Sequence, residues 1–387
     1  MNLSGRDIVC VGFADWQTDL KTNQHHLMSR LARDNRVLFV ESLGLRQPQL
    51  SSRDVRRILR RLRRGVAPPR KVDGVNVLSP LVVPLHRFGA VRALNARLLP
   101  WLVGRAARKL GMSSPILWSY NPQAEVLIDV LQPSLVLYHC VDDVAAQKGV
   151  DAASFRAAEA RFAGRANVVL TTSEPLAERL RGVSDRVIAM PNVADTELFS
   201  HALEDGPVDP AVAALPGPRI VFTGAIVATK LDVELLIALA RRRPDWNFAL
   251  VGPVGAGDPS TDVSALEREP NIHLLGLRPY DALPTVLRGA DAALIPYALN
   301  ELTASIFPMK VYEYLAAGLP VVATPLPSLR GVEGVVMAAD ADSTVARLED
   351  LLASDSPDAR AQRSKLASGH SWDARVDEIA AALNGHG

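Results

Sequence analysis

Short apolar runs alternate with helical patterns through the first part of the chain. Asp7–Gly12 and Arg36–Glu41 are apolar enough to be buried strands, and Gln24–Arg33 between them has the period of an amphipathic helix. Further strands are predicted at Val75–Leu78, Ile116–Ser119, Leu135–His139 and Val168–Thr172. Because buried strands separated by helices are typical of parallel sheets covered on both faces, residues 1–200 are predicted to form a Rossmann-like domain.

The alternation pauses and then starts again. His201–Pro218 holds six glycines or prolines in eighteen residues, which favours a linker. A helix is predicted at Asp232–Arg242, and strands at Arg219–Gly224, Asn247–Gly252, Ile272–Gly276, Ala292–Pro296, Pro320–Ala323 and Val335–Met337. Residues 219–370 therefore predict a second Rossmann-like domain, and residues 371–387 a C-terminal helix (Trp372–Leu383) whose docking stays open.

The expected fold is thus α/β, with two doubly wound parallel sheets facing a central cleft. In such sheets ligands bind beyond the carboxyl ends of the strands. The length of 387 residues agrees with two domains, and the net charge of +1 gives no indication of nucleic-acid binding. Cys10 and Cys140 lie in apolar stretches and are expected to be small buried residues. With neither a signal-peptide pattern at Met1–Asp7 nor a long apolar run, a cytoplasmic protein is expected.

Arg53–Arg64 differs from the rest of the chain. It holds seven arginines around an apolar stripe made by Val55, Ile58, Leu59 and Leu62. A basic amphipathic helix of this kind can lie on an anionic membrane surface, which would make the protein peripheral on the inner face of the cell membrane. The alternative is a solvated helix that packs its stripe on the N-terminal domain.

The segment most informative about chemistry is Phe307–Val322, FPMKVYEYLAAGLPVV. Pro308 is suited to a first helical turn, where Lys310 would add a full charge to the free N–H groups that bind phosphate. Glu313, on the same face, could accept hydrogen bonds from two vicinal sugar hydroxyls. The alternative is an ordinary helix with a surface Lys–Glu pair.

The whole string resembles the donor-site signature of the group-1 (family-4-like) glycosyltransferases of the GT-B fold, roughly P-x-K-x-x-E-x-x-A-x-G-x-P-V. Other segments agree in the family's order, namely Met190–Phe199, Gly224 with Lys230, Asn271–Leu283, Ala290–Tyr297 and Ser371–Asp373. The resemblance implies a metal-independent hexosyltransferase-like enzyme with a UDP-, GDP- or dTDP-sugar as its substrate and no further cofactor. It assigns the donor to Gly224, Lys230, Arg278, Pro308, Met309, Lys310 and Glu313. Within this set the lysines would contact the diphosphate, Glu313 the ribose and Arg278 the surroundings of the base.

Two positions depart from the family pattern. Many members have a second glutamate eight positions before the one that matches Glu313, and here that position is Ser305, with Glu301 nearby but out of register. Many also have arginine after the glycine of the phosphate loop, and here it is Ala225. The departures are similar to a subfamily of transferases for cell-surface polysaccharides, such as those proposed for teichuronic acid.

The N-terminal domain is expected to bind the acceptor, which could be a glycan, a lipid-linked sugar or a small molecule. Gly12 and Asp15 follow the first strand, and His139, Asp142 and Asp143 end or follow a later one. Asp15, His139 and Asp142 are the catalytic candidates, either as a general base in an inverting reaction or as groups near the sugar in a retaining one. Resemblance to the family favours retention. For His139 the alternative is a hydrogen-bonded histidine within a strand.

Two other functions stay open. A nucleotide-sugar epimerase could have the same two-domain architecture, and a scaffold could bind nucleotide sugars without catalysis. An NAD enzyme is disfavoured because no G-x-G-x-x-G follows the first strand. No spacing typical of a metal site is present, and His25 and His26 are interpreted as structural.

Overall fold

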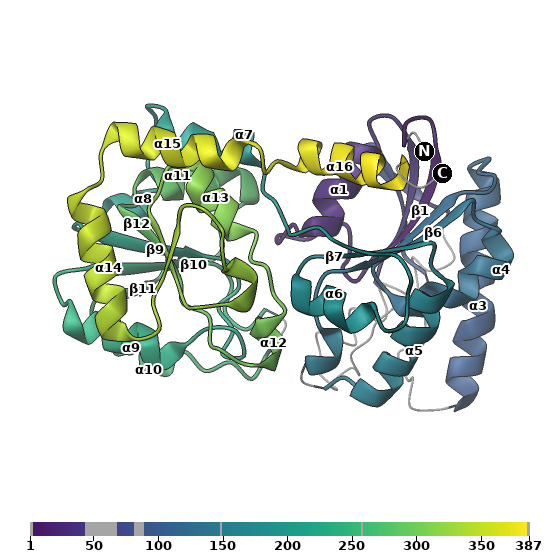
Figure 1. The fold of residues 1–387 in the computed structure, drawn as a ribbon, viewed down its shortest axis with the longest axis horizontal. Helices are drawn as coiled ribbons and strands as arrows, with labels where there is room; N and C mark the ends of the chain where they lie inside the picture. The colour runs from purple at the N-terminus through teal and green to yellow at the C-terminus, as the bar shows by residue number, and fades with distance from the viewer. Residues whose placement is uncertain (1–2, 43–67, 81–88, 148, 257, 385–387) are drawn as a thin grey trace. The chain divides into compact units, whose positions relative to one another are not determined.

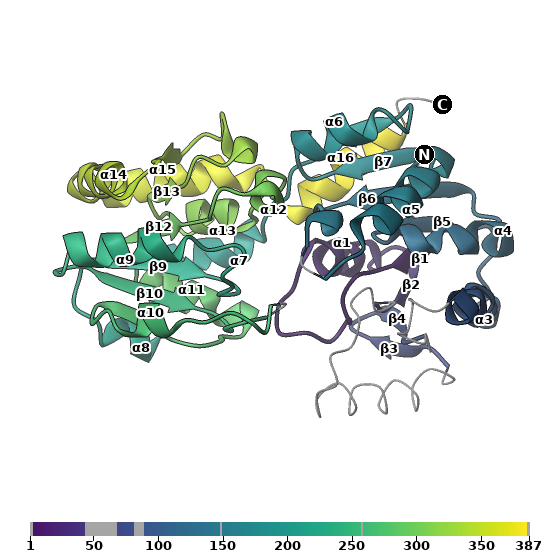
Figure 2. The same cartoon turned by 90° about the horizontal axis from the view of Figure 1, so that it is seen from below.

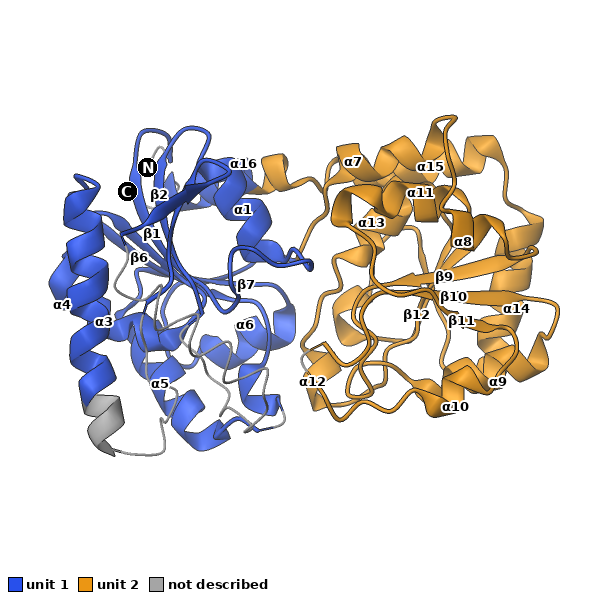
Figure 3. Cartoon of the chain, turned by 180° about the vertical axis from the view of Figure 1, so that it is seen from behind, with its two compact units in different colours: residues 1–191, 376–387 blue, residues 192–375 orange. Residues whose placement is uncertain are grey.

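The computed structural model describes residues 3–42, 68–80, 89–147, 149–256 and 258–384 (Figure 1). The chain divides into two compact units (Figure 3). Unit 1 comprises Met1–Pro191 with Val376–Gly387, and unit 2 comprises Asn192–Arg375. Arg53–Arg64, the predicted basic helix, lies outside the described residues.

Unit 1 is built on one sheet, which has eight strands among the described residues, in the order β3-β4-β2-β1-β5-β6-β7-β8. The strands are β1 (Asp7–Val11), β2 (Arg36–Val40), β3 (Arg70–Val72), β4 (Val75–Leu78), β5 (Ile116–Ser119), β6 (Leu135–Cys140), β7 (Val168–Thr171) and β8 (Val187–Ala189). All neighbours pair in parallel except β3, which forms an antiparallel pair with β4. The order runs outward in both directions from β1 and β5, so the direction of winding reverses between these two strands.

Helices pack on this sheet, with their apolar sides inward. They are α1 (Asn23–Leu31), α3 (Gly89–Lys109), η1 (Pro122–Leu127), α4 (Ile128–Leu131), η2 (Val144–Ala146), α5 (Ala152–Arg165) and α6 (Glu174–Leu180). One core cluster joins alternate residues of the central strands to α3, η1 and α5, and Phe162 and Val103 are fully buried in it. Because β6 is buried along its whole length, its side chains alternate between two covered faces rather than between core and solvent.

Unit 2 has a sheet with six parallel strands among the described residues, in the order β11-β10-β9-β12-β13-β14. They are β9 (Arg219–Thr223), β10 (Asn247–Val251), β11 (Ile272–Leu274), β12 (Ala292–Ile295), β13 (Val321–Ala323) and β14 (Val335–Met337). In chain order this is 3-2-1-4-5-6, the order of dinucleotide-binding folds, and the switch point lies between β9 and β12.

The helices of unit 2 surround one large apolar core. They are α7 (Thr196–Ser200), η3 (His201–Leu203), α8 (Pro210–Ala213), α9 (Val233–Arg242), α10 (Ser264–Glu267), η4 (Tyr280–Ala282), α11 (Leu283–Arg288), α12 (Glu301–Ala304), α13 (Lys310–Ala316), η5 (Pro327–Leu329), α14 (Ala341–Ala353) and α15 (Pro357–Ser368) (Figure 2). The last helix, α16 (Trp372–Asn384), begins in unit 2 and continues into unit 1. Side-chain caps set several of the helix starts, such as Asp232 before α9 and Asp340 before α14.

The predicted architecture of two Rossmann-like, parallel-sheet domains is confirmed. The short strands β3 and β8 were not predicted. Residues 201–218, predicted as a linker, contain η3 and α8 and belong to unit 2. The predicted C-terminal helix is α16, and the boundary between the units falls inside it, after Arg375.

Candidate functional site

The switch point of unit 2 is formed by strands whose ends approach each other very closely. Gly224 directly follows β9 with φ 132°, and its N–H donates to the carbonyl of Val251 at 2.8 Å. Gly252 follows β10 with φ 157°, and a Cβ placed on it would lie 1.8 Å from the carbonyl oxygen of Gly224. Neither backbone conformation favours a side chain, so glycines keep this edge of the sheet open at the backbone level.

Lys310, the first residue of α13, brings a positive charge to this edge. Its Nζ donates to the hydroxyl of Tyr297 at 3.0 Å and lies 5.3 Å from the ring centres of both Tyr297 and Phe222. A Cβ on Gly224 would be 3.3 Å from the same Nζ. Burial works to lower the pKa of Lys310, but Tyr297, Tyr314 and Glu313 outweigh it, and the net shift of the pKa is upward. The lysine is therefore charged at neutral pH.

The orientation of α13 is fixed by a second tyrosine on the same helix. The hydroxyl of Tyr314 accepts a hydrogen bond from the backbone N–H of Thr223 at 2.7 Å and lies 3.1 Å from the hydroxyl oxygen of Thr223. Tyr314 is fully buried. Since Thr223 ends β9, this contact ties α13 to the strand end that precedes Gly224.

Glu313 lies one residue before Tyr314 and is 6% exposed. Burial raises the pKa of its carboxyl to about 7, and the charge of Asp195 acts in the same direction. Lys310 and a hydrogen bond from Tyr280 act to lower that pKa. A buried carboxylate beside a tyrosine hydroxyl can also accept a hydrogen bond from the hydroxyl of a ligand.

Lys230 belongs to the loop that follows Gly224. The backbone of this loop is tied to the segment after β12, because the carbonyl of Lys230 accepts from the N–H of Ala298 at 2.9 Å and Leu231 forms an antiparallel bridge with Tyr297. Its side chain is partly exposed. Both lysines predicted to contact phosphate are thus connected to Tyr297, one through its side chain and the other through adjoining backbone.

Pro308 and Met309 lead into α13. The helix begins at Lys310, so Pro308 precedes it rather than lying in its first turn as predicted. Asn192 of the predicted P-N segment donates from its side chain to the carbonyl of Phe307 at 2.9 Å. This bond fixes the approach to the helix and gives the P-N segment a defined structural task.

Arg278 is engaged elsewhere. Its Nε donates to Asp209 Oδ2 at 2.6 Å, and its Nη1 to the carbonyl of Leu275 at 2.7 Å. Asp209 in turn caps α8, and the arginine holds the pKa of that carboxyl below its usual range. The guanidinium therefore joins the loop after β11 to α8, and a contact with the base stays a prediction. The residue of this loop that reaches Glu313 is Tyr280, which the sequence did not single out.

The two positions that depart from the family pattern lie in separate segments of unit 2, at Ser305 and at Ala225. Ser305 is the C-cap of α12 and is 8% exposed, while Glu301 opens the same short helix and is exposed. Ala225 directly follows Gly224. Whether Glu301 takes over the task of the missing glutamate stays a prediction.

The corresponding edge of unit 1 begins at Gly12, after β1. The N–H of Gly12 donates to the carbonyl of Val40 at 3.0 Å, and a Cβ on Gly12 would lie 2.4 Å from the ring of Phe39. His25 Nε2 lies 3.1 Å from the carbonyl oxygen of Asp15, which fixes the backbone of the loop. Burial lowers the pKa values of both His25 and His26, that of His26 to about 3. The two histidines are therefore neutral, buried groups.

His139 and Asp143, both near the end of β6, have different surroundings. His139 is 2% exposed and stacks on Tyr120, with ring centres 4.9 Å apart and an interplanar angle of 21°. Asp143 forms an ion pair with Arg156 at 2.5 Å, and Arg156 also pairs with the buried Glu159 at 3.4 Å. Asp142 lies between them and is half-buried. The aromatic packing of His139 and the ion pair of Asp143 leave their predicted roles as predictions.

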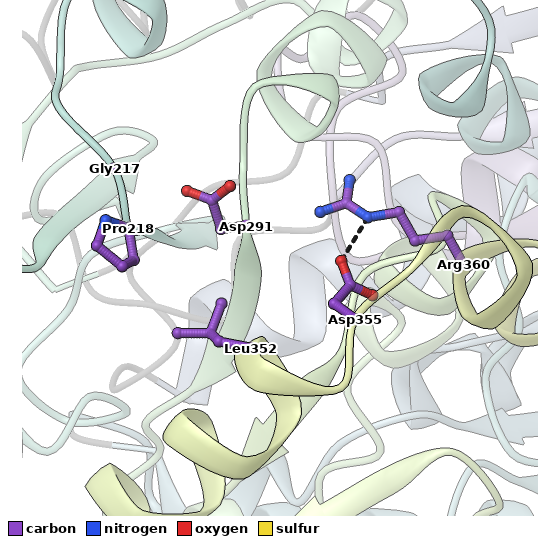
Figure 4. Close-up of a pocket in the computed structure, with 6 residues that line it drawn as sticks. All are labelled: Gly217, Pro218, Asp291, Leu352, Asp355 and Arg360. Atoms are coloured by element: carbon purple, nitrogen blue, oxygen red, sulfur yellow. Dashed lines mark hydrogen bonds and ion pairs between the residues drawn. The ribbon is translucent and has the colours of Figure 1, made fainter.

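A pocket of about 430 Å³ lies at the opposite end of the sheet in unit 2 (Figure 4). It is lined by Gly217, Pro218, Asp291, Leu352, Asp355 and Arg360. Gly217 and Pro218 precede β9 and Asp291 precedes β12, so the pocket is at the amino ends of the strands. Arg360 is paired with Asp355 at 2.7 Å, and Asp291 accepts from the N–H of Arg219. The pocket is therefore remote from Lys310 and its charged groups have partners.

Across the described ranges, no three His, Cys, Asp or Glu side chains gather in a way that could hold a metal ion. Within those same ranges, every helix is too short or too polar to cross a bilayer.

Residues 217–354 match the family model described as glycosyl transferases group 1. This stretch is a group 1 glycosyltransferase domain. It contains the switch point with Gly224, both lysines and Glu313, so the resemblance predicted from their spacing is confirmed.

A curated relative covers a larger part of the chain. It is TuaH of Bacillus subtilis (strain 168), a protein named for a proposed role as a teichuronic acid biosynthesis glycosyltransferase, and it is 30% identical over 224 residues. The aligned part is 55% of this chain and 56% of TuaH, so the match spans about half the length of that relative.

Solved structures resemble the whole chain in fold. Sucrose-phosphate synthase from Thermosynechococcus elongatus has a TM-score of 0.70 at 15% identity and covers 98% of this chain and 99% of its own. HepE of Anabaena in complex with UDP has a TM-score of 0.66 at 13% identity, with the same coverage of 98% and 99%. At these identities the similarity establishes the GT-B fold alone.

Proposed function

We propose that this protein transfers a sugar from a nucleotide-sugar donor to a hydroxyl acceptor, and that unit 2 binds the donor. The observation that carries the proposal is the charged Lys310 at the switch point beside Gly224, within the matched domain. Doubly wound sheets bind phosphate-containing ligands at this position. HepE, which shares the fold, has been crystallised with UDP and with UDP-glucose.

Each donor group has a candidate partner in unit 2. Lys310 and Lys230 would contact the diphosphate as charge-assisted donors. Glu313 would accept hydrogen bonds from the ribose hydroxyls, close to the hydroxyl of Tyr280. A nucleotide sugar is thus the substrate, and no further cofactor is proposed.

We infer the stereochemistry of transfer and the class of product from the resemblance to group 1 glycosyltransferases and from TuaH. Transfer with retention of the anomeric configuration is the expected stereochemistry. The name of TuaH favours a product in cell-surface polysaccharide, with glycolipid or secondary-metabolite synthesis as the wider class. We place the enzyme in the cytoplasm, and contact of Arg53–Arg64 with the inner face of the membrane remains a separate proposal.

The test begins with a thermal-shift screen of UDP-, GDP- and dTDP-sugars. A ligand that binds the native state alone raises stability by about 2.7 kcal/mol at a hundred times its dissociation constant. Calorimetry then compares binding of the best donor by wild type, by Glu313→Ala and by the control Glu333→Ala, an exposed position just before the start of β14. Glu313→Ala should weaken binding about tenfold or more, because one charge-assisted hydrogen bond is worth ~1.5–3 kcal/mol.

Transfer is tested by NMR of the product's anomeric configuration after an acceptor screen. Hydrolysis or epimerisation of the donor without transfer would contradict the proposed reaction. An unchanged donor affinity in Glu313→Ala would contradict the ribose contact, and binding of none of the three donor classes would contradict the proposal as a whole.

A further inference from the structure

Helix α3 presents an unusual outward surface on unit 1. Leu94 and Trp101 are 52% and 51% exposed, and Arg97, Arg105 and Arg108 are exposed between and beyond them. These positions are three, four or seven residues apart and therefore lie on one side of the helix. We call these five residues the α3 face. Figures 1 and 2 show that α3 lies at the margin of unit 1, beside α4.

The opposite side of α3 is fixed in the core of unit 1. Leu99, Val103, Ala106 and Ala107 belong to the main apolar cluster and are all at least nine-tenths buried. Because these residues hold the helix against η1 and α4, the α3 face cannot turn inward to cover its tryptophan. Its exposure is thus a consequence of the fold and not of a loosely packed helix.

The surroundings extend the apolar part of the face. Val130 of α4 is 46% exposed, and it lies against α3, since a Cβ on Gly104 would be 2.9 Å from its Cγ1. The guanidinium of Arg105 lies 5.7 Å from the centre of the Trp101 ring. Arginine and tryptophan therefore form one combined surface, with an aliphatic residue on each side.

The charge of this surface is of one sign. The sequence of α3, GAVRALNARLLPWLVGRAARK, has five basic residues and no acidic one. The nearest acidic residues on η1 and α4 are engaged with α5, because Glu125 pairs with Arg161 at 3.3 Å and Asp129 with Arg165 at 2.8 Å. The arginines of the α3 face thus lack an acidic residue on their own helix, and they can attract an anionic partner.

We propose that the α3 face docks on a membrane surface that contains anionic lipid headgroups. Tryptophan is enriched where a protein meets the bilayer interface, because its ring is apolar and its N–H polar. A helix with tryptophan, leucine and arginine on one side lies in the plane of that interface, and the arginines contact the phosphates. A second copy of the chain fits less well, since a symmetric contact would bring arginines against arginines.

This surface is separate from the donor site in unit 2, and the inference does not depend on the proposed reaction. It is also independent of Arg53–Arg64, which lies outside the described residues. Docking through α3 would orient unit 1 with respect to a bilayer, and lipid-linked acceptors would then be presented to the unit expected to bind them.

The chain supplies its own spectroscopic probe for the test. It has five tryptophans. Four are buried, with exposures of 7% for Trp16, 0% for Trp118 and 1% each for Trp246 and Trp372. Vesicles with phosphatidylglycerol should therefore shift the emission of Trp101 to shorter wavelength, and brominated lipid should quench it. Phosphatidylcholine vesicles should have much weaker effects, and added salt should reverse binding because it screens surface charges beyond ~8 Å at physiological ionic strength.

Two double variants distinguish docking through the α3 face from a general electrostatic attraction of the protein to anionic vesicles. Arg97→Gln/Arg105→Gln should weaken vesicle binding about 25-fold in co-sedimentation, since each arginine near an anionic surface contributes about fivefold. The control Arg268→Gln/Arg347→Gln removes the same charge from exposed positions of unit 2 and should leave binding nearly unchanged. Trp101→Phe should retain most of the binding but lose the spectral shift.

The full-length protein is used throughout, and the thermal unfolding of each variant reports that both units remain folded. Absence of vesicle binding at low salt would overturn the proposal. Equal losses in the two double variants would also overturn it, as would a spectral shift that persists in Trp101→Phe. A Trp101 shift that grows with protein concentration without lipid would assign the α3 face to self-association instead.

Discussion

The two units have sheets of similar winding but different chemistry at their switch points. In both, a glycine follows the strand at which the winding reverses, Gly12 after β1 and Gly224 after β9. Beside Gly224 lies the charged side chain of Lys310, whereas Gly12 is bordered by Phe39 and Gln24. The fold thus supplies the same open edge twice, and the side chains that reach it decide what can bind there.

The second difference is in the buried polar groups. Unit 2 has the carboxyl of Glu313 near its cation, an arrangement suited to hydroxyls next to a diphosphate. Unit 1 has the buried His139 stacked on Tyr120 at the end of β6. This difference agrees with a nucleotide-sugar donor in unit 2 and an acceptor in unit 1, and four predictions test it.

The largest effect is expected at the glycines themselves. Gly252→Ala should lower the free energy of unfolding by ~2–6 kcal/mol, because its new Cβ would meet backbone and its φ is unfavourable for alanine. Gly12→Ala should cost only ~1–3 kcal/mol, since Phe39 and Gln24 are side chains that can move. Urea unfolding measures both. Equal costs would mean that the two strand ends are equally constrained.

The next largest effect is expected in the pH dependence of the free energy of unfolding, to which Glu313 should contribute. Its pKa is about 7 in the folded protein, against 4.5 for an ordinary glutamate. The folded state holds this proton more tightly than the unfolded state, so the stabilisation is complete below pH 4.5 and is lost as pH rises to about 7. Glu313→Gln should therefore gain ~3 kcal/mol relative to wild type over that range. A constant difference between the two proteins would show that the pKa of Glu313 is the same in the folded and unfolded states.

The two lysines of unit 2 should affect ligand binding, whereas Arg278 should affect stability. Lys310→Ala and Lys230→Ala should each weaken nucleoside diphosphate binding about 10- to 100-fold, since a charge-assisted bond is worth ~1.5–3 kcal/mol. Binding of the bare nucleoside should hardly change. Arg278→Ala should instead reduce stability, because Asp209 would lose its partner. Calorimetry with both ligands, together with unfolding curves, separates these outcomes, and equal losses for both ligands would contradict the phosphate contacts.

The smallest effect is expected in unit 1. If transfer proceeds with retention, the departing phosphate can take the acceptor's proton, and no unit 1 side chain is indispensable. His139→Ala should then lower turnover only about tenfold and leave donor affinity intact, whereas loss of a general base usually lowers turnover by ~10²–10⁴-fold. Asp15→Ala and Asp142→Ala should lower it less. An inverted product, with activity abolished only in Asp15→Ala, would overturn both the stereochemistry and the choice of His139.

Much of the fold was predictable because parallel strands are buried on both faces and therefore appear as continuous apolar runs. Val75–Leu78, Ile116–Ser119 and Val335–Met337 have the predicted bounds. The strand β3 has the sequence Arg-Lys-Val and an exposed middle residue, so its apolar content could not indicate it. It is defined instead by antiparallel pairing with β4, which depends on tertiary context.

The site was predictable only where family spacing was available. Lys310, Glu313 and Gly224 were found in this way, and the structure brings Lys310 and Gly224 together. Tyr280 lies near Glu313, and Tyr297 contacts Lys310. Both tyrosines lie in segments that were matched to the family as a whole, without a role for either tyrosine. The partner of Arg278 is 69 positions away in the chain, so its ion pair could not be inferred from local sequence.

The position of helix α16 in the chain affects the order in which the two units can be completed during translation. Val376–Gly387 belongs to unit 1, yet it follows the whole of unit 2 in the chain. Ile379 and Leu383 are buried, and the carbonyl of Ala382 accepts a hydrogen bond from Arg186. On the ribosome, unit 2 can therefore complete its set of residues before unit 1 does. The first unit to begin translation is the last to be completed, because Ile379 and Leu383 can be buried only after the final turns of α16 have emerged.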